Sequence, residues 1–219
     1  MSVQAVLFDL DGTLIDSAPD LAGAGNDMRV ARGLPPLPFE RFRPMGGSGA
    51  RGMVGVAFET LPEQADYPAL RDEFLARYEA RLTRESRVFP DMLPVLDALD
   101  ASALRWGIDT NKIARYTAPV VAGLGLAARA GVVVCGDTTP HAKPHPAPLL
   151  EAARCLDLPP GACIYVGDDL RDVQAGRAAG MRTVAVGWGY LGLGEPIGHW
   201  RADAVVHHPR ELLQLLAMA

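Results

Sequence analysis

Short apolar runs alternate with stretches of helical periodicity along most of the chain, a pattern typical of a parallel α/β sheet. Glycines follow several of the helical stretches, at the positions where helices commonly end. The pattern predicts six strands, at residues 3–8, 104–110, 132–135, 162–166, 183–186 and 204–206. It predicts helices between them, at residues 91–101, 113–124, 147–157, 170–179 and 209–218.

The interval from Asp16 to about Arg87 breaks this alternation, because it contains no convincing strand. Four prolines between positions 35 and 44 divide its first part into short helical pieces. Residues 70–82 have the apolar spacing of an amphipathic helix. We therefore expect an all-helical cap at residues 16–87, inserted after the first strand into a core of residues 1–15 and 88–219. The linkers would lie near residues 14–18 and 84–90.

Composition narrows the choice of partners. Hydrophobic residues make up 49% of the 219 positions, and the formal net charge is −5 with no block rich in lysine or arginine. This balance argues against a nucleic-acid or membrane-surface partner. We recognise no signal peptide and no run near the ~20 apolar residues of a membrane span. Cys135, Cys155 and Cys163 lack CxxC spacing, which favours reduced thiols in a cytoplasmic protein.

Two carboxylates, Asp9 and Asp11, stand where the first apolar run ends. Paired like charges at the tip of a buried strand lose hydration and repel each other, so a divalent cation is the expected compensation. Residues two apart in an extended chain point the same way, so one carboxylate can act as nucleophile while the other transfers protons. Gly12 permits the tight turn that follows.

Polar residues also follow the second and third predicted strands. Thr110 and Asn111 can bind oxyanions at a strand–helix junction, or they can simply cap the helix at 113–124. Lys143, held before a proline, can neutralise a phosphoryl group, although an isolated Lys-Pro is usually a surface loop. His141 and His145 are interpreted as solvated loop residues.

Three carboxylates follow the fourth predicted strand. Asp169 and Asp172 have the spacing of a capping box, so Asp169 either caps a helix or joins a metal site. Asp168 follows Gly167 directly and needs another explanation. Together with Asp9 it would form an oxygen-rich site suited to Mg²⁺. Because ligands bind at the carboxyl ends of parallel strands, all four segments can converge on one pocket.

The four segments together resemble the motifs of the haloacid dehalogenase-like phosphatase superfamily, in the same order and at the same strand ends. The resemblance covers essentially the whole chain and implies a Rossmann-like three-layer α/β core with strand order 3-2-1-4-5. An acid–base Asp at position 11 argues against dehalogenase chemistry. The matching residues are, motif by motif, Asp9, Asp11, Gly12 and Thr13; Thr110 and Asn111; Lys143 and Pro144; and Gly167, Asp168, Asp169 and Asp172.

The resemblance also implies roles. Asp9 would attack phosphorus and form an aspartyl-phosphate, and Asp11 would protonate the leaving oxygen and then activate water. Mg²⁺ would be bound by Asp9, the Asp11 carbonyl and Asp168, with Asp172 helping directly or through water. The phosphoryl oxygens would be held by Thr110, the Asn111 backbone and Lys143.

A helical insert after the first strand is similar to the cap of phosphoglycolate phosphatases and of N-acetylmuramic acid 6-phosphate phosphatases. The stretches at 48–54, 166–172 and 200–209 look closest to the second group. Within the insert, Arg51 is a candidate to bind a substrate carboxylate, or else a solvated surface residue. Pro90-Asp91 stands where relatives commonly have Pro-Gly, a departure that affects only the local turn.

The leading hypothesis is a Mg²⁺-dependent phosphatase that hydrolyses a small phosphorylated metabolite in the cytoplasm, as a monomer or homodimer. One alternative is a phosphosugar mutase of the same fold, which would return the phosphoryl group to another hydroxyl. Another is a non-catalytic metabolite-binding protein. The presence of Asp9, Asp11, Lys143 and Asp168 argues against loss of catalysis.

Overall fold

The computed structural model describes residues 3–216, and its centre is a six-stranded parallel sheet. The strands lie in the order β5-β4-β1-β6-β7-β8, so the predicted order of the first five is confirmed and the sixth adds an edge strand beside the fifth. Their bounds are β1 Ala5–Phe8, β4 Arg105–Asp109, β5 Val133–Val134, β6 Cys163–Gly167, β7 Arg182–Val186 and β8 Ala204–Val206.

Helices cover both faces of the sheet because its side chains alternate between two apolar clusters. Val6 and Phe8 of β1 pack in the cluster that includes the inner sides of α5, α6 and α9, whereas Ala5 and Leu7 pack with α7 and α8. The bounds are α5 Leu93–Asp100, α6 Ala114–Gly123, α7 Ala147–Cys155, α8 Leu170–Ala178 and α9 Arg210–Leu215. The last two positions of the helix predicted at 209–218 lie outside the described residues.

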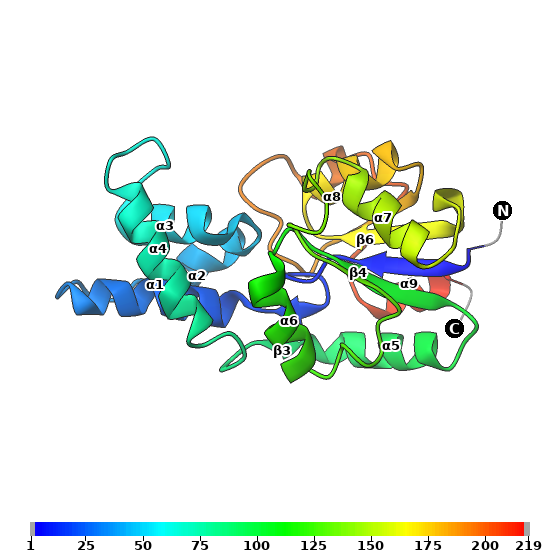
Figure 1. Cartoon of the computed structure of the whole chain (residues 1–219), viewed down its shortest axis with the longest axis horizontal. Coiled ribbons are helices and arrows are strands. Elements are labelled where there is room, and N and C mark those ends of the chain that lie inside the picture. Colours follow the sequence, from blue (N-terminus) through cyan, green and yellow to red (C-terminus); the bar gives the residue numbers. More distant parts are fainter. Residues whose placement is uncertain (1–2, 217–219) are drawn as a thin grey trace.

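Four α-helices and one 3-10 helix lie within residues 17–86 and pack on one another; we call them the helical insert. The predicted helix at 70–82 is α4. It begins three residues earlier, at Tyr67, because Pro68 is favourable in a first helical turn, and it ends at Glu79. Figure 1 places the insert at one end of the molecule, beside the carboxyl edge of the sheet. Its elements are α1 Ala18–Ala31, α2 Phe39–Phe42, η1 Arg43–Ser48, α3 Gly49–Phe58 and α4 Tyr67–Glu79. Three further 3-10 helices, η2 Pro90–Met92, η3 Pro160–Ala162 and η4 Ile197–His199, lie in the rest of the chain.

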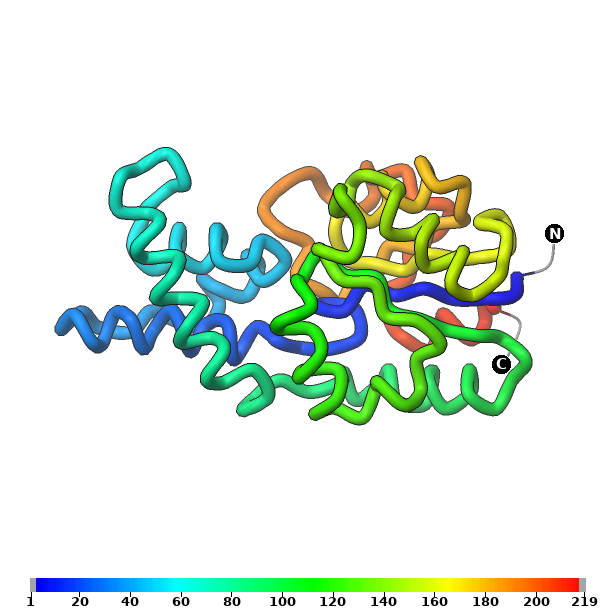
Figure 2. The backbone as a smooth tube through the Cα atoms, viewed as in Figure 1, coloured from blue at the N-terminus to red at the C-terminus, as the bar shows by residue number. Residues whose placement is uncertain are grey.

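The chain enters and leaves the insert through two neighbouring linkers. β2 (Ile15–Asp16) pairs antiparallel with β3 (Arg87–Val88), and the tube in Figure 2 shows both linkers running toward the sheet. The expectation of no strand from Asp16 to about Arg87 is therefore wrong at its two ends. Strands of two residues are too short to display the alternation by which a strand is recognised in sequence.

A buried carboxylate fastens the two linkers together. Asp20, which is fully buried in the first turn of α1, accepts the backbone N–H groups of Glu85 and Ser86 and the Ser86 hydroxyl. The Arg81 guanidinium lies 3.4 Å from the same carboxylate. These contacts satisfy the buried charge and join the start of the insert to the segment that leads into β3.

None of the helices within residues 3–216 combines the length and the apolar character that crossing a membrane demands.

Candidate active site

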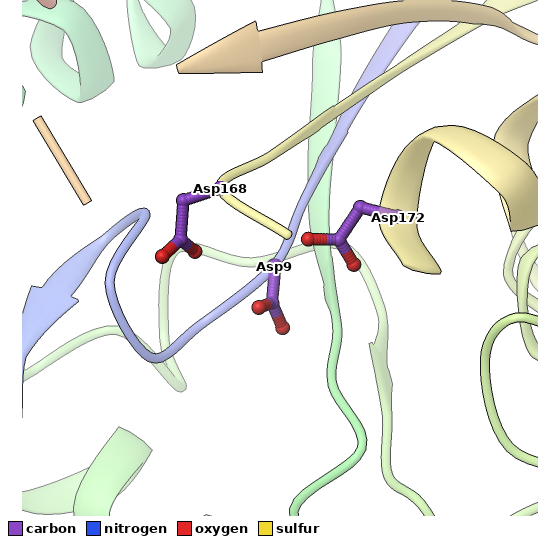
Figure 3. Close-up of side chains that lie close together, drawn as sticks. All are labelled: Asp9, Asp168 and Asp172. Atoms are coloured by element: carbon purple, nitrogen blue, oxygen red, sulfur yellow. The ribbon is translucent and has the colours of Figure 1, made fainter. Parts of the chain in front are cut away.

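Three carboxylates meet at the carboxyl edge of the sheet. Asp9 follows β1, Asp168 follows β6, and Asp172 lies in the first turn of α8 (Figure 3). One oxygen of each lies within 4.8 Å of the others, and Asp168 and Asp172 are each only 2% exposed. β1 and β6 are paired neighbours, so their ends bring residues 159 positions apart into one cluster.

Asp168 is held from two directions. The Thr13 hydroxyl donates to Oδ1 at 2.9 Å, and the Tyr190 backbone N–H donates to Oδ2 at 2.7 Å. Gly12, with φ of +85°, passes so close that a Cβ there would lie 2.3 Å from Asp168 Oδ2. The tight turn predicted from Gly12 therefore has a second purpose, since only glycine leaves room for this carboxylate.

Asp169 and Asp172 form the capping box that their spacing predicts. Asp169 is the N-cap of α8 and accepts the Arg171 backbone N–H at 2.8 Å, while Asp172 Oδ2 accepts the Asp169 N–H at 3.0 Å. The Arg171 guanidinium also binds the Asp169 carboxylate, at 2.7 Å. Asp169 thus caps the helix and pairs with an arginine, and it is not one of the three clustered carboxylates.

Lys143 is the buried cation at the centre of this edge. Its Nζ lies 3.0 Å from Asp9 Oδ1 and 2.9 Å from Asp172 Oδ1, and it donates to the Tyr165 hydroxyl at 2.5 Å. Its backbone is clamped by the Asn111 side chain, which donates to the Lys143 carbonyl and accepts the Lys143 N–H, both at 2.9 Å. The side chain of Asn111 therefore positions Lys143 through the lysine backbone.

The pKa values of these groups reflect burial and mutual repulsion. Burial raises the pKa of Asp168 to about 7, and the Asp172 carboxylate adds to this effect. Burial also raises the pKa of Asp9 well above its ordinary value, although the Lys143 ammonium acts in the opposite direction. For Lys143, burial alone would lower the pKa, but the carboxylates of Asp172 and Asp9 outweigh burial and raise it.

The donor set fits a hard divalent cation. All three clustered groups offer carboxylate oxygens, and no sulfur or imidazole ligand joins them among the residues described. Burial raises the pKa of two of these three carboxyl groups, and repulsion between the carboxylates adds to the effect, so a bound cation would stabilise their ionised forms.

Asp11 occupies a separate position on the rim of the cluster. Its Oδ1 accepts the Ser17 hydroxyl at 2.5 Å and the Lys112 ammonium at 2.7 Å. Lys112 also donates to the hydroxyl of Tyr78, at 2.7 Å, so it links Asp11 to helix α4 of the insert. Sequence reasoning assigned no role to Lys112, Tyr78 or Ser17, although Lys112 directly follows the Thr-Asn motif.

A cavity of about 390 Å³ opens over these residues, between the insert and the sheet edge. Its floor includes Asp9, Thr110 and Lys143, as the sequence predicts. The walls are mixed: apolar and aromatic side chains come from both parts, and a glycine-rich turn of the insert closes one side. The lining residues that come from the insert are Leu21, Gly46, Gly47, Ser48, Gly49, Ala50, Phe74, Leu75 and Tyr78.

Thr110 and Asn111 do not cap the following helix. The N-cap of α6 is Ile113, and the N–H of Ala114 is accepted by Asp137 Oδ1 at 2.8 Å, from a loop elsewhere in the chain. Of the two interpretations of the Thr-Asn motif, the capping one is therefore wrong. The motif instead lines the cavity.

A family model described as haloacid dehalogenase-like hydrolase matches residues 6–186. The chain belongs to this family. The predicted resemblance and the predicted class, an enzyme of a hydrolase family, are thereby confirmed. The parallel sheet of this chain, with helices on both faces, is the fold that the resemblance implied.

Named relatives of this hydrolase are phosphatases. An N-acetylmuramic acid 6-phosphate phosphatase of Pseudomonas aeruginosa is 42% identical over 219 residues, which is 100% of this chain and 97% of that protein. A phosphoglycolate phosphatase of Xanthomonas campestris is 45% identical over 210 residues, 95% of this chain and 94% of that protein. A crystal structure of a predicted phosphoglycolate phosphatase from Haemophilus somnus covers 98% of both chains, with a TM-score of 0.85 and 26% identity.

Arg51 is the one candidate that the structure leaves away from this cavity. It is exposed on α3 and lines a separate groove together with Arg41 and Leu193. The face of α3 that carries Met53 and Val54 is buried in the insert, so Arg51 points outward. A different arginine, Arg171, lines the cavity and donates to the Gly47 carbonyl of the insert at 2.7 Å.

Asp109, the last residue of β4, is a buried carboxylate without a hydrogen-bond partner on either oxygen within the described part of the chain. It is 0% exposed, and the Lys143 ammonium lies 3.8 Å away. Burial raises the pKa of Asp109 to about 7, even though Lys143 acts to lower it. Buried groups of this kind reduce stability when ionised, because they lose hydration without regaining a hydrogen bond.

We predict that Asp109→Val stabilises the protein by about 1–3 kcal/mol at pH 8. The pKa of Asp109 is higher in the folded state, about 7, than the ordinary value of 3.8, so the folded protein holds the proton more tightly. Wild-type stability therefore falls as pH rises from about 4 to about 7, and the advantage of the variant grows over the same range. Denaturant unfolding at pH 5 and pH 8 measures the difference.

Asp109→Asn is the matched control, because it removes the charge and keeps a polar, unpartnered group. It should be intermediate in stability at pH 8, and its advantage over wild type should grow with pH as that of Asp109→Val does, because both variants lack the titrating group. A less stable Asp109→Val at pH 8 would mean that this carboxylate stabilises the fold through Lys143.

We predict that MgCl₂ raises the unfolding temperature, and raises it more at pH 8 than at pH 6. The raised pKa values of Asp9 and Asp168 mean that protons compete with the cation at the lower pH, so the affinity should be severalfold higher at pH 8. Thermal unfolding at several MgCl₂ concentrations gives both affinities. In Asp168→Asn the stabilisation should disappear; a variant stabilised as much as wild type would place the cation elsewhere.

Proposed function

We propose that this protein is a Mg²⁺-dependent phosphatase that hydrolyses a small phosphate monoester through an aspartyl-phosphate intermediate. The observation that carries the proposal is the convergence of Asp9, Asp11, Lys143 and Asp168 on one cavity, in a chain of a hydrolase family. Phosphoryl transfer depends on positioning and charge neutralisation, and this edge supplies both.

In the proposed reaction, a carboxylate oxygen of Asp9 attacks phosphorus, and the bond to the ester oxygen breaks. Asp11, in its protonated form, gives a proton to the departing alkoxide, so the alcohol leaves neutral. Asp11, now ionised, takes a proton from water, and the resulting hydroxide attacks the aspartyl-phosphate. Inorganic phosphate is released, Asp9 regains its carboxylate, and Asp11 is protonated again for the next cycle.

The remaining residues of the edge would hold the phosphoryl group. The Lys143 ammonium, 3.0 Å from the nucleophile Asp9, would neutralise charge on both partners of the attack. The Thr110 hydroxyl and the Asn111 backbone would bind phosphoryl oxygens at the mouth of the strands. Because the Asn111 side chain binds the Lys143 backbone, Asn111 would set the distance between its own backbone and the lysine, two of the groups proposed to bind phosphate.

Mg²⁺ would be bound by Asp9, the Asp11 carbonyl and Asp168, and it would offset charge on the phosphoryl oxygens when bound. Both oxygens of Asp172 are already engaged, one by Lys143 and the other by the Asp169 N–H. Asp172 would help to bind the ion directly or through water.

We propose that residues 16–87 act as a cap over a core made of residues 1–15 and 88–219. Cations reach across the boundary on two sides of the cavity: Lys112 binds Tyr78, and Arg171 binds the Gly47 carbonyl. Such contacts would close the cavity around a bound substrate and limit access of bulk water, which favours hydrolysis by the one water that Asp11 activates.

The cavity favours N-acetylmuramic acid 6-phosphate over phosphoglycolate as the substrate. Phosphoglycolate is a phosphate and a carboxylate joined by a methylene, and it has no surface to place against an apolar wall. The cavity has such a wall, formed by side chains that include Leu21, Phe74, Ile113 and Tyr116. The acetamido and lactyl methyl groups of the muramic acid would bury against it, with a gain of roughly 25 cal/mol for each Å² of apolar surface. A cytoplasmic location and a monomeric or dimeric state remain predictions.

We predict that Asp9→Asn lowers turnover of p-nitrophenyl phosphate by at least about a thousandfold, because an amide is not a nucleophile for phosphorus. Removing Mg²⁺ with EDTA should abolish wild-type turnover, and added MgCl₂ should restore it. Phosphate release measures both effects. Asp72→Asn, on an exposed part of α4, is the matched control and should keep wild-type activity. Wild-type turnover by Asp9→Asn would exclude the proposed nucleophile.

We predict a higher kcat/KM for N-acetylmuramic acid 6-phosphate than for phosphoglycolate when the two are compared by phosphate release. Ile113→Ala trims the apolar wall at a residue that is 40% exposed, so the fold should tolerate it. It should lower kcat/KM for the muramic acid by roughly five- to tenfold and leave that for phosphoglycolate nearly unchanged.

Leu150→Ala removes a similar exposed leucine on α7, outside the cavity, and should affect neither substrate. A preference for phosphoglycolate would reject the substrate assignment but keep the reaction class. Isomerised sugar phosphate with no free phosphate would indicate a mutase.

A further inference from the structure

Helix α1 begins without a cap from its own N-cap residue. Ser17 holds that position, where a serine hydroxyl usually accepts a backbone N–H of the first turn, but its side chain makes no such bond. The hydroxyl instead donates to Asp11 Oδ1, at 2.5 Å. The N–H groups at the start of the helix therefore need an acceptor from elsewhere in the chain.

Tyr190, in the segment after β7, supplies that acceptor. Its hydroxyl accepts the N–H groups of Ser17 and Ala18, at 2.8 and 2.9 Å. It also donates to Asp16 Oδ1 at 3.0 Å, which uses its one donor position. The next residue, Pro19, has no N–H to satisfy. A single phenol thus accepts the N–H groups of Ser17 and Ala18, while the Ser17 side chain binds Asp11.

The Tyr190 ring has little freedom to move. It is 3% exposed, and the Arg43 guanidinium lies 5.4 Å from its centroid while donating to the carbonyl oxygens of Trp188 and Gly189. On another side, a Cβ at Gly46 would lie 2.5 Å from the ring, so only glycine allows the insert to approach this closely. A ring fixed in this way places its hydroxyl reproducibly.

The backbone of Tyr190 also reaches the carboxylate cluster, since its N–H donates to Asp168 Oδ2 at 2.7 Å. We propose that Tyr190 is a positioning residue: its hydroxyl fixes the backbone of Ser17, and Ser17 in turn holds Asp11 where it exchanges protons with the substrate. The inference rests on the proposed function, in which Asp11 is the acid–base group. Lys112 provides the other hydrogen bond to Asp11, so loss of Tyr190 would weaken this positioning without abolishing it.

The test uses two substrates that differ in how much they need an acid. The nitrophenolate of p-nitrophenyl phosphate is a weak base and leaves with little protonation, whereas the alkoxide of an alkyl phosphate requires a proton. Tyr190→Phe removes only the hydroxyl and keeps the ring and the N–H to Asp168. We expect kcat/KM to fall about tenfold for the best alkyl phosphate and less than about threefold for p-nitrophenyl phosphate.

Two internal controls accompany this comparison. The Mg²⁺ concentration for half-maximal activity should stay at the wild-type value, because the backbone contact to Asp168 is retained. Tyr67→Phe removes the hydroxyl of a different buried tyrosine, which lies in the insert and makes no side-chain hydrogen bond within residues 3–216, and it should match wild type on both substrates. Equal losses on the two substrates in Tyr190→Phe would indicate a general disturbance of the linker and overturn the proposal.

A double variant tests the route through Ser17. If Tyr190 acts on Asp11 by way of the Ser17 hydroxyl, Tyr190→Phe combined with Ser17→Ala should lose no more activity than Ser17→Ala alone. Ser17→Thr, which keeps a hydroxyl, should retain most of the wild-type preference for alkyl substrates. Multiplying losses in the double variant would show two independent effects and reject this route.

Asp11→Asn, measured on the same two substrates, separates the inference from the proposed function. A larger loss on the alkyl phosphate supports the acid role of Asp11, and the Tyr190 and Ser17 variants then decide the inference by themselves. Equal losses would refute the acid role in the proposed function, and the inference about Tyr190 would fall with it.

Discussion

A single buried ammonium makes the carboxyl edge of this sheet possible. Lys143 Nζ lies 3.0 Å from Asp9, 2.9 Å from Asp172 and 3.8 Å from Asp109, so three acidic groups that would repel one another share one positive charge. One cation cannot neutralise three carboxylates and Asp168 as well, and the pKa values of Asp9, Asp109 and Asp168 are all raised. The remaining deficit of positive charge is what gives the edge its capacity for a divalent ion.

Much of the core could be predicted because its determinants are local. Apolar runs separated by helical periodicity gave the strands, and the end of each strand marked the place where Asp9, Lys143 and Asp168 would meet. The capping box of Asp169 and Asp172 could also be predicted, since such a cap depends only on two residues three positions apart. The roles proposed for these residues rest on chemistry and remain open to experiment.

What the sequence could not provide are contacts that depend on how the helical insert sits against the core. The hydrogen bond from Lys112 to Tyr78 joins a loop of the core to helix α4. No sequence pattern relates the two segments, and the bond forms only because α4 has a particular orientation. The position of Arg51 could not be predicted for the same reason, because the buried face of α3 is defined by neighbours in the insert. Asp109 shows a different limit. Its place at the end of a strand is visible in the sequence, but whether a buried carboxylate finds a hydrogen-bond partner depends on the tertiary structure.

The paired linkers have a consequence for how such a protein can change over time. β2 and β3 are adjacent, and Asp20 fastens the second linker to the start of α1, so the two ends of the insert are fixed relative to each other whatever lies between them. The entropic cost of closing a longer or shorter loop between such fixed points grows only slowly with its length. The chain can therefore exchange the insert, which we propose contacts the substrate, while the residues of the sheet edge keep their register. On that proposal, selectivity can diverge without changes in the residues proposed for the chemistry.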